Sequence, residues 1–275
     1  MQSTIATLAA RAPGVVSVVV EGPAGVLVDL DGGRVVPAAS TIKVLVMVAA
    51  LDQVAGGWLG LDQPVPLPGQ RVGGSGPLSM LGSVSQITLA EALHLMITLS
   101  DNDATNAVLD LLGDDAVTDV GDRAGLTGTF LRRRMMDLQA RAAGRENHTT
   151  ARDLAHLMAR LRQGVLLPEP LTALALDVLA RQQHVDGLPA LLTPDVSCGN
   201  KTGELEGVRH DVALLERDGR WCSVAVTATD LADPDTGVDR GSTVWPQVAE
   251  IGAAVAEWLT TGTGRTDDLP GRRRP

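Results

Sequence analysis

The sequence of 275 residues lacks the features that mark several structural classes. It has no tyrosine, one phenylalanine and two cysteines, and its 30 glycines and 15 prolines follow no period. Collagen-like, low-complexity, repeat and disulfide-scaffold structures are therefore excluded. The longest apolar runs, such as 44–51, fall far short of the roughly 20 residues that a membrane-spanning helix needs. These properties predict a soluble globular protein with a substantial core.

Positive charge is also scarce. The formal net charge is −10 and the pI is near 4.9, so the chain offers no basic surface to neutralise phosphates, and we expect no nucleic-acid partner. No His, Cys and Asp cluster has zinc spacing, and no glycine-rich phosphate or dinucleotide motif occurs. We therefore expect neither a metal nor another cofactor, and a small molecule or peptide as the partner.

Lysine is the rarest basic residue. Of the 23 lysines and arginines, only Lys43 and Lys201 are lysine. A sequence so biased towards arginine keeps lysine where arginine cannot replace it, and the clearest such place is chemistry in which an amine loses its proton. The alternative is that two surface lysines remain by chance. The residues around each lysine must decide between these two explanations.

Apolar periodicity divides the chain into strands at both ends and helices between them. A helix is expected at 2–11, followed by a hairpin of strands 15–21 and 26–31. Further helices are expected at 41–54, 89–99, 103–112, 151–161 and 171–179, and the middle of the chain as a whole is predicted to be helical. Strands at 196–202, 208–217 and 220–229 and a closing helix at 244–260 complete the pattern.

This order predicts an α/β (α+β) fold, in which an antiparallel sheet from both chain ends carries flanking helices and an all-helical domain is inserted. The sheet domain is expected to comprise 1–36 and 190–262, the helical domain 37–189, and a flexible tail 263–275. Cys198 and Cys222 fall on strands with a third strand between them. Strand spacing then holds them about 10 Å apart, beyond disulfide reach, so we expect free, buried thiols.

The first motif is S-x-x-K, formed by Ser40 and Lys43 at the start of the first core helix. Spacing of i, i+3 puts the hydroxyl and the amine on one helical face. Burial shifts a lysine towards its neutral form, which can then take the proton of a serine nucleophile. Alone, the pattern is common by chance.

Two further motifs follow. Ser100, Asp101 and Asn102 (S-D-N) stand where one helix ends and another begins, a position that also suits a simple helix cap. Lys201, Thr202 and Gly203 (K-T-G) stand on a strand, where a cation and a hydroxyl suit a substrate carboxylate and glycine permits close backbone approach; an ordinary edge lysine is the alternative. The three motifs in this order are a strong combined signal.

Over roughly residues 1–260 the sequence resembles the class A β-lactamases and their penicillin-binding relatives. The resemblance implies that Ser40 is the acylated nucleophile, Lys43 its proton acceptor and Ser100 the proton shuttle to the leaving nitrogen. It further implies that Asn102 holds the substrate amide, that Lys201 and Thr202 bind the carboxylate, and that the backbone N–H groups of Ser40 and Glu204 form the oxyanion hole.

Arg209, on the next strand, falls where this family often places a second carboxylate-binding cation, although an ordinary solvated strand residue fits equally well. The absence of tyrosine makes class C β-lactamases and related esterases, which use a catalytic tyrosine, poor matches.

One departure concerns the Ω-loop, whose glutamate activates the deacylating water in class A β-lactamases. The sequence has Ala140 three residues after Asp137, where the family pattern has glutamate, and the loop is short. Glu146 is a possible substitute base but aligns better with the loop exit, which favours a structural role. Acylation is therefore expected, and rapid deacylation is not.

Three functional hypotheses follow. The first is a serine hydrolase that forms an acyl-enzyme with a β-lactam or a related amide or ester, including a D-alanyl-D-alanine peptidase or a non-β-lactam esterase. The second is a penicillin-binding module that stays acylated, and the third a degenerate homologue, which the two retained lysines disfavour. The expected substrate is a β-lactam or a peptidoglycan-like acyl compound, and the expected state is a monomer.

The compartment depends on the native start of the chain. Residues 1–12 lack the basic start and the long apolar core of a signal peptide. We expect a cytoplasmic protein if Met1 is the native start, and a secreted or periplasmic one if a signal peptide has been removed.

Overall fold

The computed structural model describes residues 1–113, 115–233 and 235–261. Its centre is a five-stranded antiparallel sheet in the order β2-β1-β9-β8-β7. The strands are β1 (Val15–Gly22), β2 (Gly25–Leu30), β7 (Ser197–Leu205), β8 (Val208–Arg217) and β9 (Arg220–Thr229). Strands from the two ends of the chain therefore pair side by side, which confirms the predicted mixed α/β fold with an antiparallel sheet.

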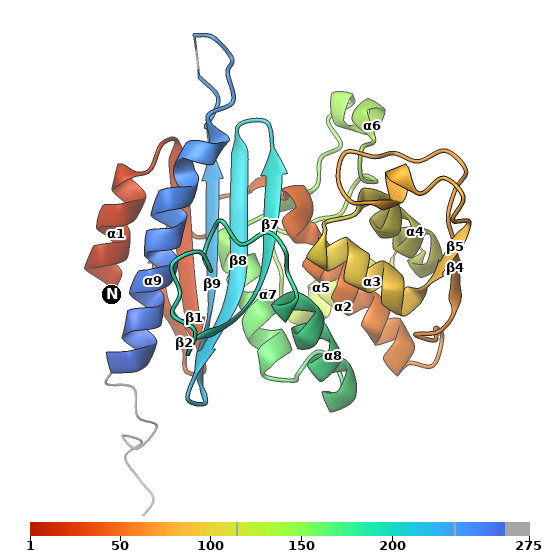
Figure 1. Ribbon diagram of the computed structural model, residues 1–275. Coiled ribbons are helices and arrows are strands. Elements are labelled where there is room, and N and C mark those ends of the chain that lie inside the picture. The colour runs from red at the N-terminus through yellow and green to blue at the C-terminus, as the bar shows by residue number, and fades with distance from the viewer. Residues whose placement is uncertain (114, 234, 262–275) are drawn as a thin grey trace, which may run out of the picture.

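Alternation along each strand separates two apolar cores. In β1, Val18 and Val20 join the core beneath α1 (Gln2–Arg11) and α9 (Trp245–Thr261), whereas Val19 joins the core on the opposite face. Figure 1 shows α1 and α9 together on one side of the sheet. The other side is covered by α7 (Ala151–Arg162) and α8 (Glu169–Ala180), which contact β1, β9 and β7.

The remaining helices lie beyond that second face (Figure 1). They are α2 (Ile42–Ala55), α3 (Leu89–Thr98), α4 (Asn102–Leu112), α5 (Ala116–Ala124) and α6 (Leu138–Ala142). Every residue of α2 from Ile42 to Leu51 is buried, because other helices surround it. Apart from Lys43, this stretch is apolar, which is typical of a central helix without a face turned to solvent.

The middle of the chain is not purely helical, and that part of the prediction is wrong. Short strands pair as β3 (Val36–Pro37) with β6 (His148–Thr149), and as β4 (Pro64–Pro66) with β5 (Gln86–Thr88). Segments of two or three residues are too short to show a period, so the sequence pattern could not reveal them.

The division into a sheet domain and a helical domain remains a prediction. α7 and α8 fall within the predicted helical segment 37–189, yet they pack against the sheet. The predicted tail at 263–275 lies outside the described residues. No helix among those described is long and apolar enough to cross a membrane.

The two cysteines are free, as predicted, and β8 runs between their strands. Leu215 pairs with Cys198 on one side and with Cys222 on the other. Cys222 is fully buried, but Cys198 on the edge strand is only partly so.

Candidate active site

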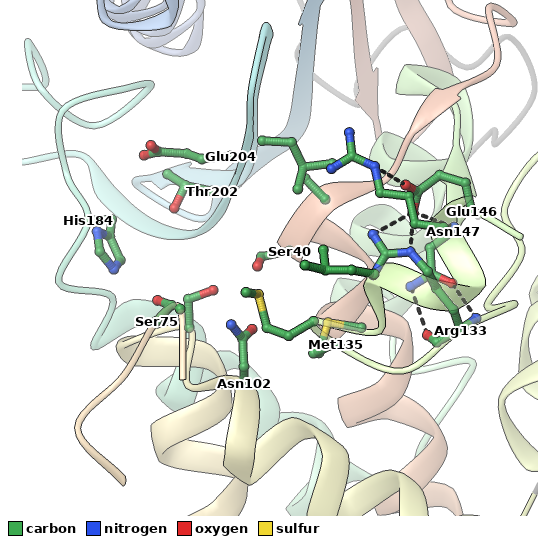
Figure 2. Close-up of a pocket in the computed structure, with 17 residues that line it drawn as sticks. Ser40, Ser75, Asn102, Arg133, Met135, Glu146, Asn147, His184, Thr202 and Glu204 are labelled. Atoms are coloured by element: carbon green, nitrogen blue, oxygen red, sulfur yellow. Dashed lines mark hydrogen bonds and ion pairs between the residues drawn. The ribbon is translucent and has the colours of Figure 1, made fainter. Parts of the chain in front are cut away.

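A cavity of about 430 Å³ lies where β7 meets the helical elements. Six parts of the chain form its wall: the turn before α2, the loop between β4 and β5, the junction between α3 and α4, the loop between α5 and α7, the segment after α8, and β7. The lining residues include Ser40, Ser75, Ser100, Asn102, Met135, Met136, Leu138, Glu146, His184, Thr202 and Glu204 (Figure 2). Ser40 is central among the labelled side chains in this view.

Ser40 stands on a short 3₁₀ turn, Ala39–Thr41, that leads directly into α2. Gly203 of β7 packs against this turn, where an added Cβ would lie 3.1 Å from the Ser40 nitrogen. A larger residue here would have to push the turn away by a few tenths of an ångström, so glycine suits the close approach of the strand to the Ser40 turn.

Lys43 lies one turn further along, fully buried. Its amine is 2.6 Å from the Ser100 carbonyl oxygen, 2.8 Å from Asn102 Oδ1 and 3.1 Å from Ser100 Oγ. Burial lowers the pKa of Lys43 well below its ordinary value, the nearby charge of Lys201 lowers it further, and Asp101 opposes the change. The site thus favours an amine that can accept a proton.

Ser100 occupies the junction of α3 and α4 with a left-handed backbone, φ 54°. This uncommon conformation is held by Asp101, the N-cap of α4, whose carboxylate accepts hydrogen bonds from the backbone N–H groups of Ala104 (2.8 Å) and Leu78 (2.9 Å). Asp101 is thus the helix cap, as the simpler interpretation of S-D-N predicted, while Ser100 and Asn102 line the cavity.

Lys201 reaches the same hydroxyl from the opposite side. It is fully buried, and its amine lies 3.1 Å from Ser100 Oγ and 2.7 Å from the Thr202 carbonyl oxygen. Burial lowers the pKa of Lys201 to about 7, against the opposing charges of Asp211 and Glu204. One consistent proton arrangement has charged Lys201 donating to Ser100 Oγ, which donates its own proton to neutral Lys43.

Asn102 fixes the position of this group of polar side chains. Its Oδ1 accepts from Lys43, and its Nδ2 donates to the Gly73 carbonyl oxygen at 2.9 Å. The asparagine thereby joins the buried lysine to the loop that forms the cavity rim.

The substrate-binding residues predicted on β7 and β8 occupy different positions relative to the cavity. Thr202 and Glu204 line the cavity, and Lys201 lies buried behind it. Arg209 is not among the lining residues. Its guanidinium pairs with Asp239 at 2.9 Å and with Glu204 at 3.4 Å, so its charge is shared with two acids.

Glu146 lines the cavity but is held by arginines. Its carboxylate lies 2.7 Å from Arg133 Nη2 and 3.4 Å from Arg141 Nε, and it also accepts from the Asn147 N–H at 2.8 Å. Asn147 Oδ1 in turn accepts from the backbone N–H groups of Arg132 and Arg133. These bonds tie the end of the loop to its start, and they favour the structural role predicted for Glu146.

The interpretation of Ala140 as the residue at the glutamate position is wrong. Ala140 is 2% exposed within α6 and borders a neighbouring cavity. Met135 and Met136 line the Ser40 cavity instead. The short helix α6, capped by Asp137, turns the chain away from the Ser40 cavity after Met136. Counting residues along a loop cannot predict such a turn.

Sequence reasoning also missed residues that shape the cavity. Asn106, one turn after Asn102 on α4, holds Met135 at both ends of its backbone: its Oδ1 accepts from the Met135 N–H at 2.8 Å, and its Nδ2 donates to the Met135 carbonyl at 3.1 Å. The i, i+4 spacing of two asparagines was the available signal. Ser75 and His184 lie on loops with no motif, so nothing in the sequence indicated them.

The comparisons agree with this geometry. The Beta-lactamase enzyme family matches residues 1–258. A β-lactamase of Streptomyces albus G is 31% identical over 64% of this chain, and the match spans 55% of that enzyme, about half its length. The structure of a β-lactamase from Sphaerobacter thermophilus is 29% identical, with a TM-score of 0.84 over 94% of this chain and 98% of that one.

A second solved structure is that of a mutant of PBP-A, as an acyl-enzyme complex with penicillin G. It is 26% identical, with a TM-score of 0.82 over 94% of this chain and 96% of that one. Fold and site together define the class of β-lactamase-type serine hydrolases. The chain belongs to the class A β-lactamase family.

Proposed function

We propose that the protein is a class A β-lactamase-like serine hydrolase that forms an acyl-enzyme through Ser40. The observation that carries the proposal is the position of Ser100 Oγ, 3.1 Å from both buried lysine amines and beside the cavity that Ser40 lines. A hydroxyl between a neutral and a charged amine can pass a proton in either direction, which acyl transfer from an amide requires.

Acylation then requires one nucleophilic attack and a cycle of proton transfers between Ser40, Lys43 and Ser100. Ser40 Oγ attacks the carbonyl carbon of the substrate amide, and its proton passes to the neutral amine of Lys43. When the C–N bond breaks, the leaving nitrogen takes a proton from Ser100 Oγ, and Lys43 returns its proton to Ser100. The result is an ester on Ser40 and an amine, with Lys43 neutral again; in a β-lactam this amine stays attached to the acyl group, because the broken bond belonged to the ring.

The substrate is held at both ends of the cavity. The backbone of β7 lies against Ser40 at Gly203, which supports an oxyanion hole formed by the N–H groups of Ser40 and Glu204. Lys201 and Thr202 are suited to a substrate carboxylate, and Asn102 to the amide of the acyl side chain. We assign Arg209 no direct contact with the substrate, because its guanidinium is paired with two acids.

The geometry supports slow deacylation. Hydrolysis of the ester needs a group that takes a proton from water. Among the described residues that line the cavity, the carboxylates are Glu146 and Glu204. The first is paired with two arginines, and the second, with a side chain 52% exposed, is paired with Arg209. Methionines occupy the loop wall, and they have no basic group.

A penicillin-binding module that stays acylated is the second candidate, and the two methionines are the observation in its favour. A mutant of PBP-A, one of the structural relatives, was captured as an acyl-enzyme with penicillin G. A peptidoglycan-like substrate and a monomeric state belong to this proposal as further expectations.

Intact mass spectrometry during incubation with penicillin G tests the function directly. We expect the mass to rise by one whole penicillin molecule, because the opened ring stays attached to Ser40. Consumption of intact β-lactam should show a burst of about one equivalent, followed by a slow steady rate. A lasting adduct with no turnover identifies the binding module. No adduct, or rapid turnover without a burst, contradicts the proposal of an acyl-enzyme that accumulates.

The loop supplies a matched pair of variants. Met135→Glu is expected to accelerate the steady phase, because Asn106 fixes the backbone of this residue at the cavity wall. Ala140→Glu is expected to leave that phase unchanged, because position 140 borders a different cavity. Single-turnover deacylation rates measure both. Equal acceleration by the two variants would show that the position of the carboxylate does not matter, contrary to the structure.

A further inference from the structure

One buried histidine has no part in the mechanism described above. His210 on β8 is fully buried. In the register of the sheet it stands directly opposite Gly203 of β7, so the two residues lie on the same face. Gly203 is the residue that packs against the Ser40 turn, and β8 contacts this turn as well. His210 therefore lies beneath the turn that carries the nucleophile.

The imidazole of His210 binds the chain shortly before the nucleophile. Its Nε2 lies 2.8 Å from the carbonyl oxygen of Pro37, three residues before Ser40. Its Nδ1 lies 3.2 Å from the backbone nitrogen of Ala228 and 2.8 Å from the carbonyl oxygen of Arg209. A proton on Nε2 allows two hydrogen bonds, one donated to Pro37 and one accepted from Ala228, whereas a proton on Nδ1 allows one. Burial lowers the pKa of His210 to about 4, although both carbonyl oxygens oppose the change, so the ring is neutral near pH 7.

The residue just before Ser40 has a strained backbone. Ala39 has a φ of 47°, a left-handed conformation that persists in a residue other than glycine only where its surroundings hold it. Two hydrogen bonds hold the chain on its N-terminal side. The Pro37 carbonyl accepts from His210, and the Ala38 N–H donates at 2.7 Å to the carbonyl oxygen of Asn147, at the end of the loop between α5 and α7. The first bond fastens the turn to the sheet.

This attachment affects the oxyanion hole, because its two N–H donors come from different elements. One belongs to Ser40 on the turn, and the other to Glu204 on β7. Gly203 limits how closely the turn can approach β7. In the described part of the chain, the bond from His210 is the only hydrogen bond between residues 36–41 and the strands of the five-stranded sheet. It keeps the turn from moving away, so the separation of the two donors depends on it.

We propose that His210 is a positioning residue for acylation. Its Nε2–H bond to the Pro37 carbonyl holds the Ser40 turn against β7 and thereby sets the separation of the two oxyanion-hole donors. The proposal rests on the proposed function, since these donors matter only if Ser40 attacks a carbonyl group. They bind the negative oxygen of the transition state more strongly than the carbonyl oxygen of the substrate. Loss of the His210 bond should therefore slow acylation and leave the initial binding of substrate nearly unchanged.

The test compares two variants that differ in the reach of one amide group. His210→Gln can place its N–H near the position of Nε2 and donate to Pro37, whereas His210→Asn reaches only the position of Nδ1. Acylation by penicillin G over a range of concentrations gives the rate constant at saturation and the half-saturating concentration. In His210→Asn the rate constant should fall by roughly 10- to 100-fold, since a small misplacement of reacting groups can cost about 10²-fold. The half-saturating concentration should stay near its wild-type value, and His210→Gln should recover most of the rate.

A second histidine supplies the matched control. His156 on α7 packs against the same face of the sheet, where its Nδ1 lies 3.1 Å from the Glu21 carboxylate, and neither residue is among the described residues that line the cavity. His156→Asn should leave both constants unchanged.

A boronic acid probes the oxyanion hole directly. Ser40 Oγ adds to the boron as its proton leaves, and one oxygen of the resulting tetrahedral anion takes the place of the oxyanion. The affinity for the boronic acid should therefore fall in His210→Asn in parallel with the acylation rate constant.

The outcomes separate this inference from the proposed function. If neither penicillin G nor a fluorophosphonate labels the wild type, the proposed function fails. If the wild type is labelled, three results overturn only the inference: an unchanged rate constant in His210→Asn, equal losses in the Asn and Gln variants, or a loss that lies in the half-saturating concentration instead.

Nuclear magnetic resonance of the wild type observes the hydrogen bond without any need for activity. The chain has five histidines, so ¹⁵N-labelled histidine gives few ring signals. The His210 ring should carry its proton on Nε2, and this proton should exchange slowly with water and show scalar coupling to the Pro37 carbonyl carbon. If neither variant folds, this measurement decides, and a proton on Nδ1 or rapid exchange at Nε2 overturns the inference.

Discussion

Replacing Ser40 with alanine is expected to abolish covalent labelling by both penicillin G and fluorophosphonates. The side chain lines the cavity beside two buried lysines, and without its hydroxyl no ester can form. Intact mass spectrometry should therefore show the unmodified mass at every time point. Residual turnover, if any, should proceed without a burst, because the burst is the formation of the ester.

The variant should fold normally. A helix-capping hydroxyl contributes about 1 kcal/mol, and in the described part of the chain Ser40 makes no such capping bond. Ser75→Ala is the matched control, because Ser75 lines the same cavity but donates its hydroxyl proton to the Leu99 carbonyl oxygen. It should retain labelling. Labelling that persists in Ser40→Ala and disappears in Ser75→Ala would identify a different nucleophile.

The three motifs could be recognised from the sequence because each depends on short-range spacing. Ser40 and Lys43 are separated by one helical turn, and Lys201 is next to Thr202 on a strand. Such relations are fixed by the geometry of the element itself. The resemblance to a known family then indicated that the three motifs belong to one site, and the hydrogen bonds of both lysines to Ser100 are consistent with that interpretation.

The long elements of the fold were predictable for a related reason. The strands β8 and β9 have the bounds expected from alternation, and the first helix has those expected from its period. A pattern of ten residues contains several repeats, whereas β3 and β6 contain two residues each. Their pairing is decided by tertiary contacts between distant parts of the chain, which no local pattern records.

The loop from 131 to 148 could not be interpreted correctly because side-chain bonds determine its path. Asn147 binds the backbone at its start, Glu146 binds Arg133, and Asn106 holds Met135 from a separate helix.

Replacing Lys43 with arginine is expected to lower the acylation rate by about 10²- to 10⁴-fold, the usual contribution of a general base. Arginine keeps the positive charge but does not release its proton in proteins, so it cannot accept one from Ser40. The present site lowers the pKa of Lys43 by burial and by the charge of Lys201, and this effect is useful only for a group that titrates. Stopped-flow acylation with a chromogenic cephalosporin measures the rate.

Lys201→Arg is the informative comparison, because both lysines are fully buried and both contact Ser100 Oγ. Any cation can bind a carboxylate, so Lys201→Arg should lower the acylation rate less than Lys43→Arg does. The pKa of Lys201 is near 7, and the wild type should therefore lose acylation efficiency as the pH rises through that value and the amine becomes neutral. Arginine remains charged, so the alkaline decline should flatten in Lys201→Arg. Equal losses in the two variants, with an unchanged pH profile, would mean that the lysines do not divide the roles of base and carboxylate anchor.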